Sequence, residues 1–254
     1  MTNIVICGSS GAMGKVINNI VSTRDDSKVV AGIDKNGEGT TDFPVVATPN
    51  LLSSLSIEPD VIIDFSHPSV LDGLLDYCLT NRVALVIATT GYSQEDIEKI
   101  HNAAKEISLF FTANMSMGVN LIAELAKKAV SVLGDQFDIE IVEKHHNQKI
   151  DAPSGTALML ADEINKELDQ PYSYTYDRQS VREKRTKKEI GLHAIRGGTI
   201  VGDHDIIFAG RDEVITLSHQ AASKEVFAVG AVNAAIFLKG KEPGLYNMKN
   251  LISL

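Results

Sequence analysis

Short apolar runs alternate with amphipathic segments along residues 1–115. The runs are continuous and rich in β-branched side chains, which is typical of strands buried on both faces of a parallel sheet. They cover Ile4–Cys7, Lys28–Ile33, Val61–Phe65, Val83–Ala88 and Leu109–Phe111. The spacing of apolar positions predicts helices over Met13–Thr23, Pro68–Leu79 and Ser93–Lys105. This alternation predicts right-handed strand–helix–strand units and a doubly wound parallel sheet, so the expected fold class is α/β.

The pattern changes after residue 116. Helical spacing predicts helices over Gly118–Leu133, Ser154–Leu168 and Ser223–Leu238. Strand patterns occur at Phe137–Lys144, Ile190–Ile195, Thr199–Phe208 and Glu213–His219. We expect these strands to be mostly antiparallel, with Gly197-Gly198 at a hairpin turn. A smaller α+β region therefore follows the strand–helix units.

Composition excludes several classes of protein. The 254 residues are 44% hydrophobic and 22% charged, which excludes a disordered chain, a coiled coil and a disulfide scaffold. The 24 Lys and Arg against 33 Asp and Glu give a net charge of −9, so we expect no nucleic-acid partner and no membrane binding. Cys7 and Cys78 are unclustered, and the first apolar run is too short for a signal sequence, so we expect a cytoplasmic protein.

One segment departs from this acidic average. Gln170–Lys188 is polar and ends in a basic run of Arg182, Lys184, Arg185, Lys187 and Lys188. Blocks of like charge are usually solvated, so we expect a mobile loop here. A loop that packs at a subunit interface is a more plausible alternative than a nucleic-acid site, because the net charge of the chain opposes the latter.

A glycine loop joins the first predicted strand to the first predicted helix. It runs Gly8, Ser9, Ser10, Gly11, Ala12, Met13, Gly14. Glycines at such a turn let the backbone approach a pyrophosphate, which then lies at the helix N-terminus. Asp34 ends the second strand, 20 positions beyond Gly14, where a ribose hydroxyl would need an acceptor. Asp34 favours NAD, whereas Lys35 could neutralise the 2′-phosphate of NADP, so both cofactors stay open.

Small polar residues follow three further strands. The segments are Asp64–Pro68, Ala88–Tyr92 and Thr112–Met115. Ligands of open α/β sheets lie outside the carboxyl ends of the strands, so these loops fit a dinucleotide groove. His67 is expected to be a loop or capping residue and not a catalyst.

The densest chemical motif is Glu140–Ala157, with the sequence EIVEKHHNQKIDAPSGTA. A predicted strand ends in His145 and His146, Lys149 follows, and a helix then begins at Ser154–Thr156. Free N–H groups at a helix start suit a carboxylate, and a histidine can deliver a proton near neutral pH. The motif therefore predicts a small carboxylate substrate that is protonated once. Neighbouring histidines on a strand point to opposite faces, so we expect no metal site.

This motif resembles the signature of the 4-hydroxy-tetrahydrodipicolinate reductase (dihydrodipicolinate reductase) family. The pattern E-[IV]-x-E-x-H-x-x-x-K-x-D-x-P-S-G-T-A matches throughout Glu140–Ala157. Further blocks resemble the same family along the chain: the glycine loop, Asp64–Ser66, Thr89–Gly91, Ala113–Ser116, Gly118–Asn120, Arg196–Gly198 and Ile200–Gly202.

The resemblance implies a reductase of lysine and diaminopimelate biosynthesis that uses NADH or NADPH and yields tetrahydrodipicolinate. By that resemblance His145 donates the proton and Lys149 assists, while His146 and the amides of Gly155 and Thr156 bind the carboxylates of a small dicarboxylate substrate. The implied cofactor-binding residues are Gly8, Ser9, Ser10, Gly11, Ala12, Met13, Asp34, Lys35, Ala88, Thr89, Thr90, Thr112, Ala113, Asn114 and Met115.

The family fold implies a Rossmann-like dinucleotide domain over residues 1–116 and 220–254. Residues 117–219 would then form a substrate-binding and oligomerisation domain whose mixed sheet usually builds a homotetramer. Ala12, Ser10 and Ala88 stand where the family commonly has arginine, glycine and glycine. The missing arginine removes a phosphate contact, so the preference between NADH and NADPH stays open. Two alternatives remain, another Rossmann oxidoreductase acting on an imine or amino acid, and a non-catalytic NAD(P)H sensor.

Overall fold

The computed structural model describes residues 1–35 and 42–252 and divides the chain into two compact units. The first unit comprises Met1–Met117 and Glu225–Leu254, and the second comprises Gly118–Lys224. Residues 36–41 and 253–254, which belong to the expected first domain, lie outside the described residues. No helix in the described part of the chain is both long and apolar enough to span a bilayer.

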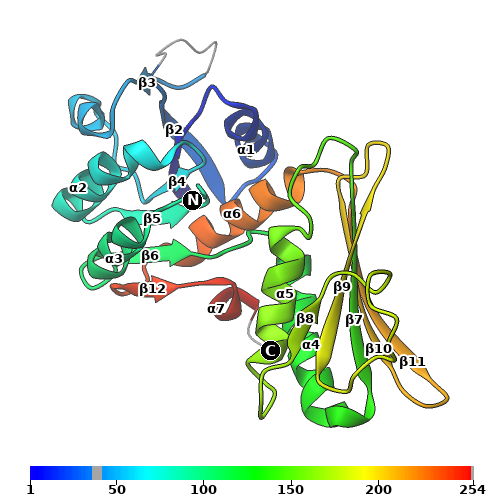
Figure 1. Cartoon of the computed structure of the whole chain (residues 1–254). Coiled ribbons are helices and arrows are strands. Elements are labelled where there is room, and N and C mark those ends of the chain that lie inside the picture. Colours follow the sequence, from blue (N-terminus) through cyan, green and yellow to red (C-terminus); the bar gives the residue numbers. More distant parts are fainter. Residues whose placement is uncertain (36–41, 253–254) are drawn as a thin grey trace. The chain divides into compact units, whose positions relative to one another are not determined.

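A seven-stranded parallel sheet forms the centre of the first unit (Figure 1). Its strands, in spatial order, are β12 (Gly244–Tyr246), β6 (Ser108–Phe111), β5 (Ala84–Ile87), β4 (Val61–Asp64), β1 (Thr2–Cys7), β2 (Ser27–Ile33) and β3 (Val45–Val46). The five predicted strands are confirmed. The edge strands β3 and β12 were not predicted, because two or three residues are too few to show a period.

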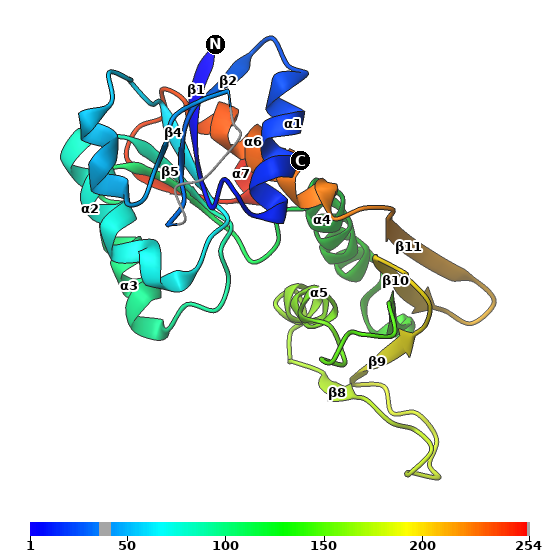
Figure 2. The same ribbon diagram turned by 90° about the horizontal axis from the view of Figure 1, so that it is seen from above.

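Helices cover both faces of this sheet, as Figures 1 and 2 show. On one face α2 (Leu71–Asn81) and α3 (Gln94–Ala103) pack on Val5, Ile62 and Leu85. On the other face α1 (Ala12–Ser22) and α6 (Glu225–Leu238) pack on Ile4, Ile6, Ile63 and Val86. Alternate residues of one strand thus enter opposite cores, which explains why the central strands are continuously apolar.

Local signals set the helix starts in this unit. Ser93 and Asp96 form a reciprocal capping box at the start of α3, as their spacing predicted. The helix predicted from Pro68 begins instead as a 3₁₀ turn, Pro68–Val70, with the α2 helix starting at Leu71. His67 caps that turn, because its Nδ1 accepts a hydrogen bond from the Ser69 amide. The last helix of the described residues is the short α7 (Met248–Ile252).

The second unit is a five-stranded mixed sheet with two helices on one face (Figure 1). Its strand order is β11 (Val214–Ala221), β10 (Gly202–Ala209), β7 (Asp138–His145), β9 (Glu189–Arg196) and β8 (Ser173–Thr175). The helices α4 (Met117–Leu133) and α5 (Gly155–Asn165) bury the apolar side of β7, β9 and β10. The fold class is therefore α/β, a Rossmann-like parallel sheet followed by a mixed sheet.

Two details of the second sheet differ from the sequence prediction. The pairs β7–β9 and β8–β9 are parallel, whereas β7–β10 and β10–β11 are antiparallel, so the strands are not mostly antiparallel. Gly197-Gly198 is also not a hairpin turn, because β7 lies between β9 and β10. The segment crosses the end of β7, and the local turn signal could not reveal which strands it joins.

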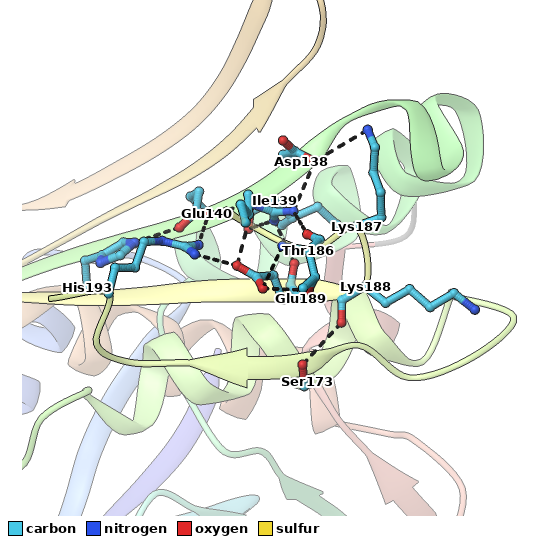
Figure 3. A network of polar contacts seen from close by, with 11 residues as sticks. Asp138, Ile139, Glu140, Ser173, Thr186, Lys187, Lys188, Glu189 and His193 are labelled. Atoms are coloured by element: carbon cyan, nitrogen blue, oxygen red, sulfur yellow. Dashed lines mark hydrogen bonds and ion pairs between the residues drawn. The ribbon is translucent and has the colours of Figure 1, made fainter. Parts of the chain in front are cut away.

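The basic run is anchored to the sheet by one of its arginines. Arg185 donates hydrogen bonds to the carboxylates of Asp138 and Glu140 and to the carbonyl oxygens of Ile139 and Glu189. Figure 3 shows Asp138, Ile139, Glu140 and Glu189, which accept these hydrogen bonds. The expectation of a solvated loop fits the exposed side chains of Arg182, Lys184, Lys187 and Lys188. It does not fit Arg185, whose side chain is only 18% exposed.

Packing of α6 predicts a specific sensitivity. A Cβ at Gly230 would lie 1.8 Å from the Met115 carbonyl oxygen, so Gly230→Ala must displace backbone. We expect a loss of roughly 1–3 kcal/mol or more in the free energy of unfolding, measured by urea denaturation. Gly73→Ala in α2 is the matched control, because its Cβ would meet Pro49 at an ordinary 3.6 Å. Equal stability of the two variants would contradict this account.

Candidate functional site

The first unit contains a cavity of about 410 Å³ at the carboxyl ends of β1, β2 and β4. Its lining includes four of the predicted cofactor residues, Gly8, Gly11, Asp34 and Lys35. Phe65, Ser66 and His67 also line it, and they belong to the Asp64–Pro68 loop that was expected to border a dinucleotide groove. The other lining residues, which were not assigned to the cofactor from the sequence, are Cys7, Ile33, Ala47, Ser69 and Val70. The cavity therefore lies where ligands of open parallel sheets bind.

The glycine loop is shaped by close backbone approach. Gly8 has a positive φ of 83°, and a Cβ there would lie 2.5 Å from the Phe65 carbonyl oxygen. A Cβ at Gly14 would lie 2.3 Å from the Gly8 carbonyl oxygen. Gly11 is the N-cap of α1 and provides no side-chain cap, and the first turn of α1 carries no acidic residue. This cradle fits the pyrophosphate of a dinucleotide, which binds to the open N–H groups of such a helix start.

Asp34 is fixed beside this cradle. Its Oδ2 accepts a hydrogen bond of 3.1 Å from the Ser10 amide. The carboxylate and Lys35 both line the cavity, so the two charges that were expected to decide between NAD and NADP lie at one site. The Ser9 side chain points toward Gly32, since a Cβ at Gly32 would lie only 2.4 Å from the Ser9 hydroxyl oxygen. Ser9 therefore does not line the cavity. Ala12 is exposed and Met13 half-buried near the same helix start.

The remaining predicted cofactor residues do not line this cavity. Thr89 accepts a hydrogen bond from the Ser66 amide, so it supports the neighbouring loop. Asn114 accepts one from the Ser116 amide, and Met115 is buried in the core beneath α6. Ala88 packs against the same core. Thr90 and Ala113 are exposed, and Thr112 is half-buried.

Asp64 was expected at a strand end and in a family block but was given no role of its own, and the structure shows that it organises the cavity wall. It ends β4, is fully buried, and accepts hydrogen bonds from the amide and hydroxyl of Ser66 and from Tyr92 Oη at 3.1 Å. Burial and the Asp64 charge raise the pKa of both the Cys7 thiol and the Tyr92 phenol. Both groups therefore stay neutral donors. An acidic residue that ends a continuous apolar strand was the available signal.

The second unit holds the predicted catalytic histidine. His145 is the last residue of β7, and its Nδ1 lies 2.6 Å from Oε2 of Glu143, two residues earlier on the same strand face. The His145 side chain is 11% exposed and that of Glu143 is fully buried. Nε2 of His145 lies close to Gly202 of β10, where a Cβ would be 3.1 Å away. The absence of a side chain at position 202 keeps this nitrogen uncrowded.

Glu143 is the main hydrogen-bond acceptor of this site. Its carboxylate accepts hydrogen bonds from Arg196 Nη1 at 2.8 Å, Arg196 Nη2 at 2.6 Å and the Ser154 amide at 3.0 Å. Burial opposes ionisation, but the hydrogen bonds from Arg196 and His145 outweigh it and hold the pKa of Glu143 below its ordinary value. Pairing with Glu143 in turn raises the pKa of Arg196. The site thus contains a buried ion pair next to an imidazole.

The other signature residues surround this pair. Lys149 Nζ lies 2.9 Å from Asp151 Oδ1, and this contact lowers the pKa of the Asp151 carboxyl. His146 is half-buried in the turn after β7, where its carbonyl oxygen accepts a hydrogen bond from the Lys149 amide. Lys149 and His146 therefore share the short loop that links β7 to α5.

The start of α5 forms the second wall of the site. Ser154 is the N-cap, and its hydroxyl accepts a hydrogen bond from the Ala157 amide. Gly155 is the first helical residue, it is exposed, and a Cβ there would meet nothing within 4 Å. The helix start is consequently uncovered at Gly155, where an anion was predicted to bind, and the half-buried Thr156 follows it.

A second histidine was missed as part of this site. His204 of β10 is buried, its Nε2 lies 3.1 Å from Ser154 Oγ, and its ring packs edge-on against His145 at 5.3 Å between centroids. Burial, with the nearby His145, lowers the pKa of His204 to about 4. His204 is therefore a neutral packing partner at neutral pH. Alternate residues of β10 are buried and His204 is one of them, but no local pattern shows which residue it packs against. Within residues 1–35 and 42–252, no three His, Cys, Asp or Glu side chains form a metal-binding group.

Comparisons with known proteins cover the whole chain. The family model described as dihydrodipicolinate reductase, N-terminus, matches residues 2–115, and that described as dihydrodipicolinate reductase, C-terminus, matches residues 118–252. A 4-hydroxy-tetrahydrodipicolinate reductase of Clostridium tetani is 49% identical over 100% of this chain and 98% of its own length. One from Caldanaerobacter subterraneus subsp. tengcongensis is 50% identical over 99% of this chain and 98% of its own length. A solved structure, the dipicolinate-bound dihydrodipicolinate reductase from Paenisporosarcina sp. TG-14, has a TM-score of 0.79 at 25% identity and covers 98% of this chain and 99% of its own.

The lowered pKa of His204 predicts a pH effect on stability. The ordinary pKa of histidine is 6.5, and that of His204 in the folded chain is about 4. Between these two pH values the unfolded chain binds a proton at this imidazole that the folded chain does not bind. Stability therefore falls as pH decreases through this window. In His204→Gln this contribution disappears, so Tm should fall less steeply from pH 6.5 to 4, as measured by differential scanning calorimetry. His101→Gln, at an exposed position, is the control and should keep the wild-type slope of Tm against pH. An unchanged slope of Tm against pH in His204→Gln would contradict this account.

Proposed function

The chain belongs to the dihydrodipicolinate reductase family, and we propose that it reduces 4-hydroxy-tetrahydrodipicolinate to tetrahydrodipicolinate with NADH or NADPH, in lysine and diaminopimelate biosynthesis. One observation carries the chemical part of the proposal. An imidazole paired with a buried carboxylate stands beside a loop lysine and an open helix start. A proton donor and an anion site are thus available together, as the reduction of an unsaturated dicarboxylate requires.

In this proposal the second unit binds the substrate. One carboxylate accepts hydrogen bonds from the amides of Gly155 and Thr156, where the α5 dipole favours negative charge. His146 and Lys149 contribute positive or donor groups from the loop before α5. The bound dipicolinate of the Paenisporosarcina enzyme, a dicarboxylate, supports this class of ligand.

His145 supplies the proton. Glu143 orients the imidazole through Nδ1, which leaves Nε2 facing the uncrowded space beside Gly202. After the 4-hydroxyl group of the substrate has left as water, the ring is unsaturated, and Nε2 gives its proton to the carbon next to the one that receives hydride. Lys149 assists by holding a substrate carboxylate. The contact with the buried Glu143 carboxylate holds the imidazole ring in one orientation for the transfer.

The first unit binds the cofactor. Gly8, Gly11 and the start of α1 would hold the pyrophosphate, and Asp34 would accept a hydrogen bond from the adenosine ribose. The other residues proposed for this role are Ser9, Ser10, Ala12, Met13, Lys35, Ala88, Thr89, Thr90, Thr112, Ala113, Asn114 and Met115. Of these, Ser9, Thr89, Asn114 and Met115 would act through the backbone or by supporting a loop, because their side chains are buried. When bound, the reduced nicotinamide supplies the hydride.

The proposal extends to assembly. In the second unit, the face of the sheet opposite α4 and α5 carries Val142 and Ile207, both half-buried, with Ile195 48% and Val214 63% exposed. An apolar stripe on an otherwise polar sheet face supports an interface between copies of the chain. We propose a homotetramer built through this sheet, as the family resemblance implies.

The test is turnover. Substrate is generated in situ from pyruvate and aspartate semialdehyde by the preceding synthase, and loss of NADH or NADPH absorbance is followed. Oxidation should require every component. His145→Gln should lower kcat by roughly 10²–10⁴-fold, because general acid catalysis contributes about that much, with little effect on cofactor affinity. Cofactor binding without turnover by folded wild-type protein would favour the sensor, and oxidation of a free amino acid would favour an amino-acid dehydrogenase.

The charges beside the cradle predict cofactor preference. Asp34→Asn keeps an acceptor for the Ser10 amide but removes the charge that repels a 2′-phosphate. We expect kcat/KM with NADPH to rise roughly tenfold relative to NADH, which corresponds to about 1.4 kcal/mol. Asp76→Asn, at an exposed position on α2, is the matched control and should leave the ratio unchanged. An unaltered ratio in Asp34→Asn would remove Asp34 from the ribose site.

A further inference from the structure

The structure assigns a shared positioning role to Glu143 and Arg196: together they set which nitrogen of His145 carries the proton, and Arg196 also holds the loop of Lys149. Neither residue is proposed to touch the substrate. The kinetic consequence rests on the proposed function, whereas the state of the imidazole can be observed without any substrate.

The Glu143 carboxylate contacts four partners. Oε1 accepts from Arg196 Nη2 and the Ser154 amide, and Oε2 accepts from Arg196 Nη1 and faces His145 Nδ1. Three of these four partners can only donate, and the hydrogen bonds from Arg196 outweigh burial and lower the pKa of Glu143. The carboxyl group is therefore ionised and only accepts hydrogen bonds. Consequently Nδ1 of His145 must carry hydrogen. In the neutral ring Nε2 is then bare, and Nε2 is the nitrogen that takes up and releases the transferable proton.

Arg196 neutralises the buried charge of Glu143. The Glu143 side chain is fully buried, and a buried charge without a partner is strongly destabilising. Arg196 meets it with two nearly parallel hydrogen bonds of 2.6 and 2.8 Å, a fork geometry that lysine cannot reproduce. Register explains the match, because Arg196 is the β9 residue opposite His145 in the parallel pair.

Arg196 also connects this pair to the loop that contains Lys149. Arg196 Nη2 also donates to the Asp151 carbonyl oxygen at 2.7 Å, and the Asp151 carboxylate pairs with Lys149 Nζ at 2.9 Å. One guanidinium therefore fixes the carboxylate that orients His145 and the backbone of the loop that presents Lys149. Loss of Arg196 should disturb both groups, whereas loss of the Glu143 charge should disturb the imidazole first.

The same strand offers a matched control. Glu140 also lies on β7, and its carboxylate contacts His193 Nε2 at 2.6 Å and accepts hydrogen bonds from Arg178 and Arg185 (Figure 3). The pairing of a carboxylate with histidine and arginine is thus repeated on the opposite face of the sheet, where it anchors the loop before β9. Glu140→Gln removes an equivalent charge without contact with the proposed site.

The first measurement is the tautomer of His145. Protein labelled with ¹⁵N-histidine is examined by long-range ¹H–¹⁵N NMR at a pH where the ring is neutral, and the signal is assigned by its loss in His145→Gln. We expect hydrogen on Nδ1 in the wild type and in Glu140→Gln. We expect a mixture, or hydrogen on Nε2, in Glu143→Gln. A wild-type ring with hydrogen on Nε2, or an unchanged tautomer in Glu143→Gln, would overturn the assignment whatever the enzyme reduces.

The second measurement separates kcat from KM. Glu143→Gln should lower kcat roughly 10²-fold or more with KM for the substrate nearly unchanged, because the acid is misoriented but the binding groups remain. Arg196→Gln should lower kcat about 10–100-fold and also raise KM, through the loop of Lys149. Arg196→Lys should recover part of kcat, since it keeps the charge but loses the fork.

The controls distinguish the possible failures. Wild-type protein without turnover would contradict the proposed function and leave the tautomer result standing. Turnover of Glu143→Gln or Arg196→Gln equal to that of Glu140→Gln would overturn the positioning role. If Arg196→Gln does not fold, as judged by circular dichroism, Arg196→Lys and the near-isosteric Glu143→Gln still decide the question through kcat, KM and the tautomer.

Discussion

A single carboxylate with no access to water organises the second unit. Glu143 gathers hydrogen bonds from β9 through Arg196, from the start of α5 through Ser154, and from its own strand through His145. A buried charge requires several donors in fixed places, so the segments that supply them must meet at this point. The position of α5, the crossing of residues 197–201 and the path of the loop with Lys149 all follow from that requirement.

The first unit depends on an equivalent constraint of shape. Backbone atoms at Gly8, Gly14 and Phe65 approach so closely that no side chain fits between them. This contact brings the start of α1 against the ends of β1 and β4, and the buried Asp64 fixes the adjoining loop through Ser66 and Tyr92. The cavity beside Asp34 is the space that remains.

Two glutamates of the signature motif, Glu140 and Glu143, have different roles. Residues of β7 alternate between faces, so Glu140 stabilises the loop that contains the basic run while Glu143 supports the proposed proton donor. Identical residue types at positions 140 and 143 thus hold a loop against one face of the sheet and support the proposed catalytic histidine on the other. The motif was recognisable as a unit, but its division into two networks depends on strand alternation and on arginines distant in the sequence.

Local patterns determined most of the secondary structure. Continuous apolar runs located the five long strands of the first sheet, and Ser93 with Asp96 located a helix start, because these signals depend only on near neighbours. The glycine loop and the Glu140–Ala157 motif located both candidate sites for the same reason. Tertiary structure alone decided that β7 separates β9 from β10, that Arg196 reaches Glu143 while Arg185 reaches Glu140, and that His204 packs on His145. These contacts join residues that are up to 59 positions apart in the sequence. They depend on the order of the strands and on the length of the side chains, and a local sequence pattern contains neither kind of information.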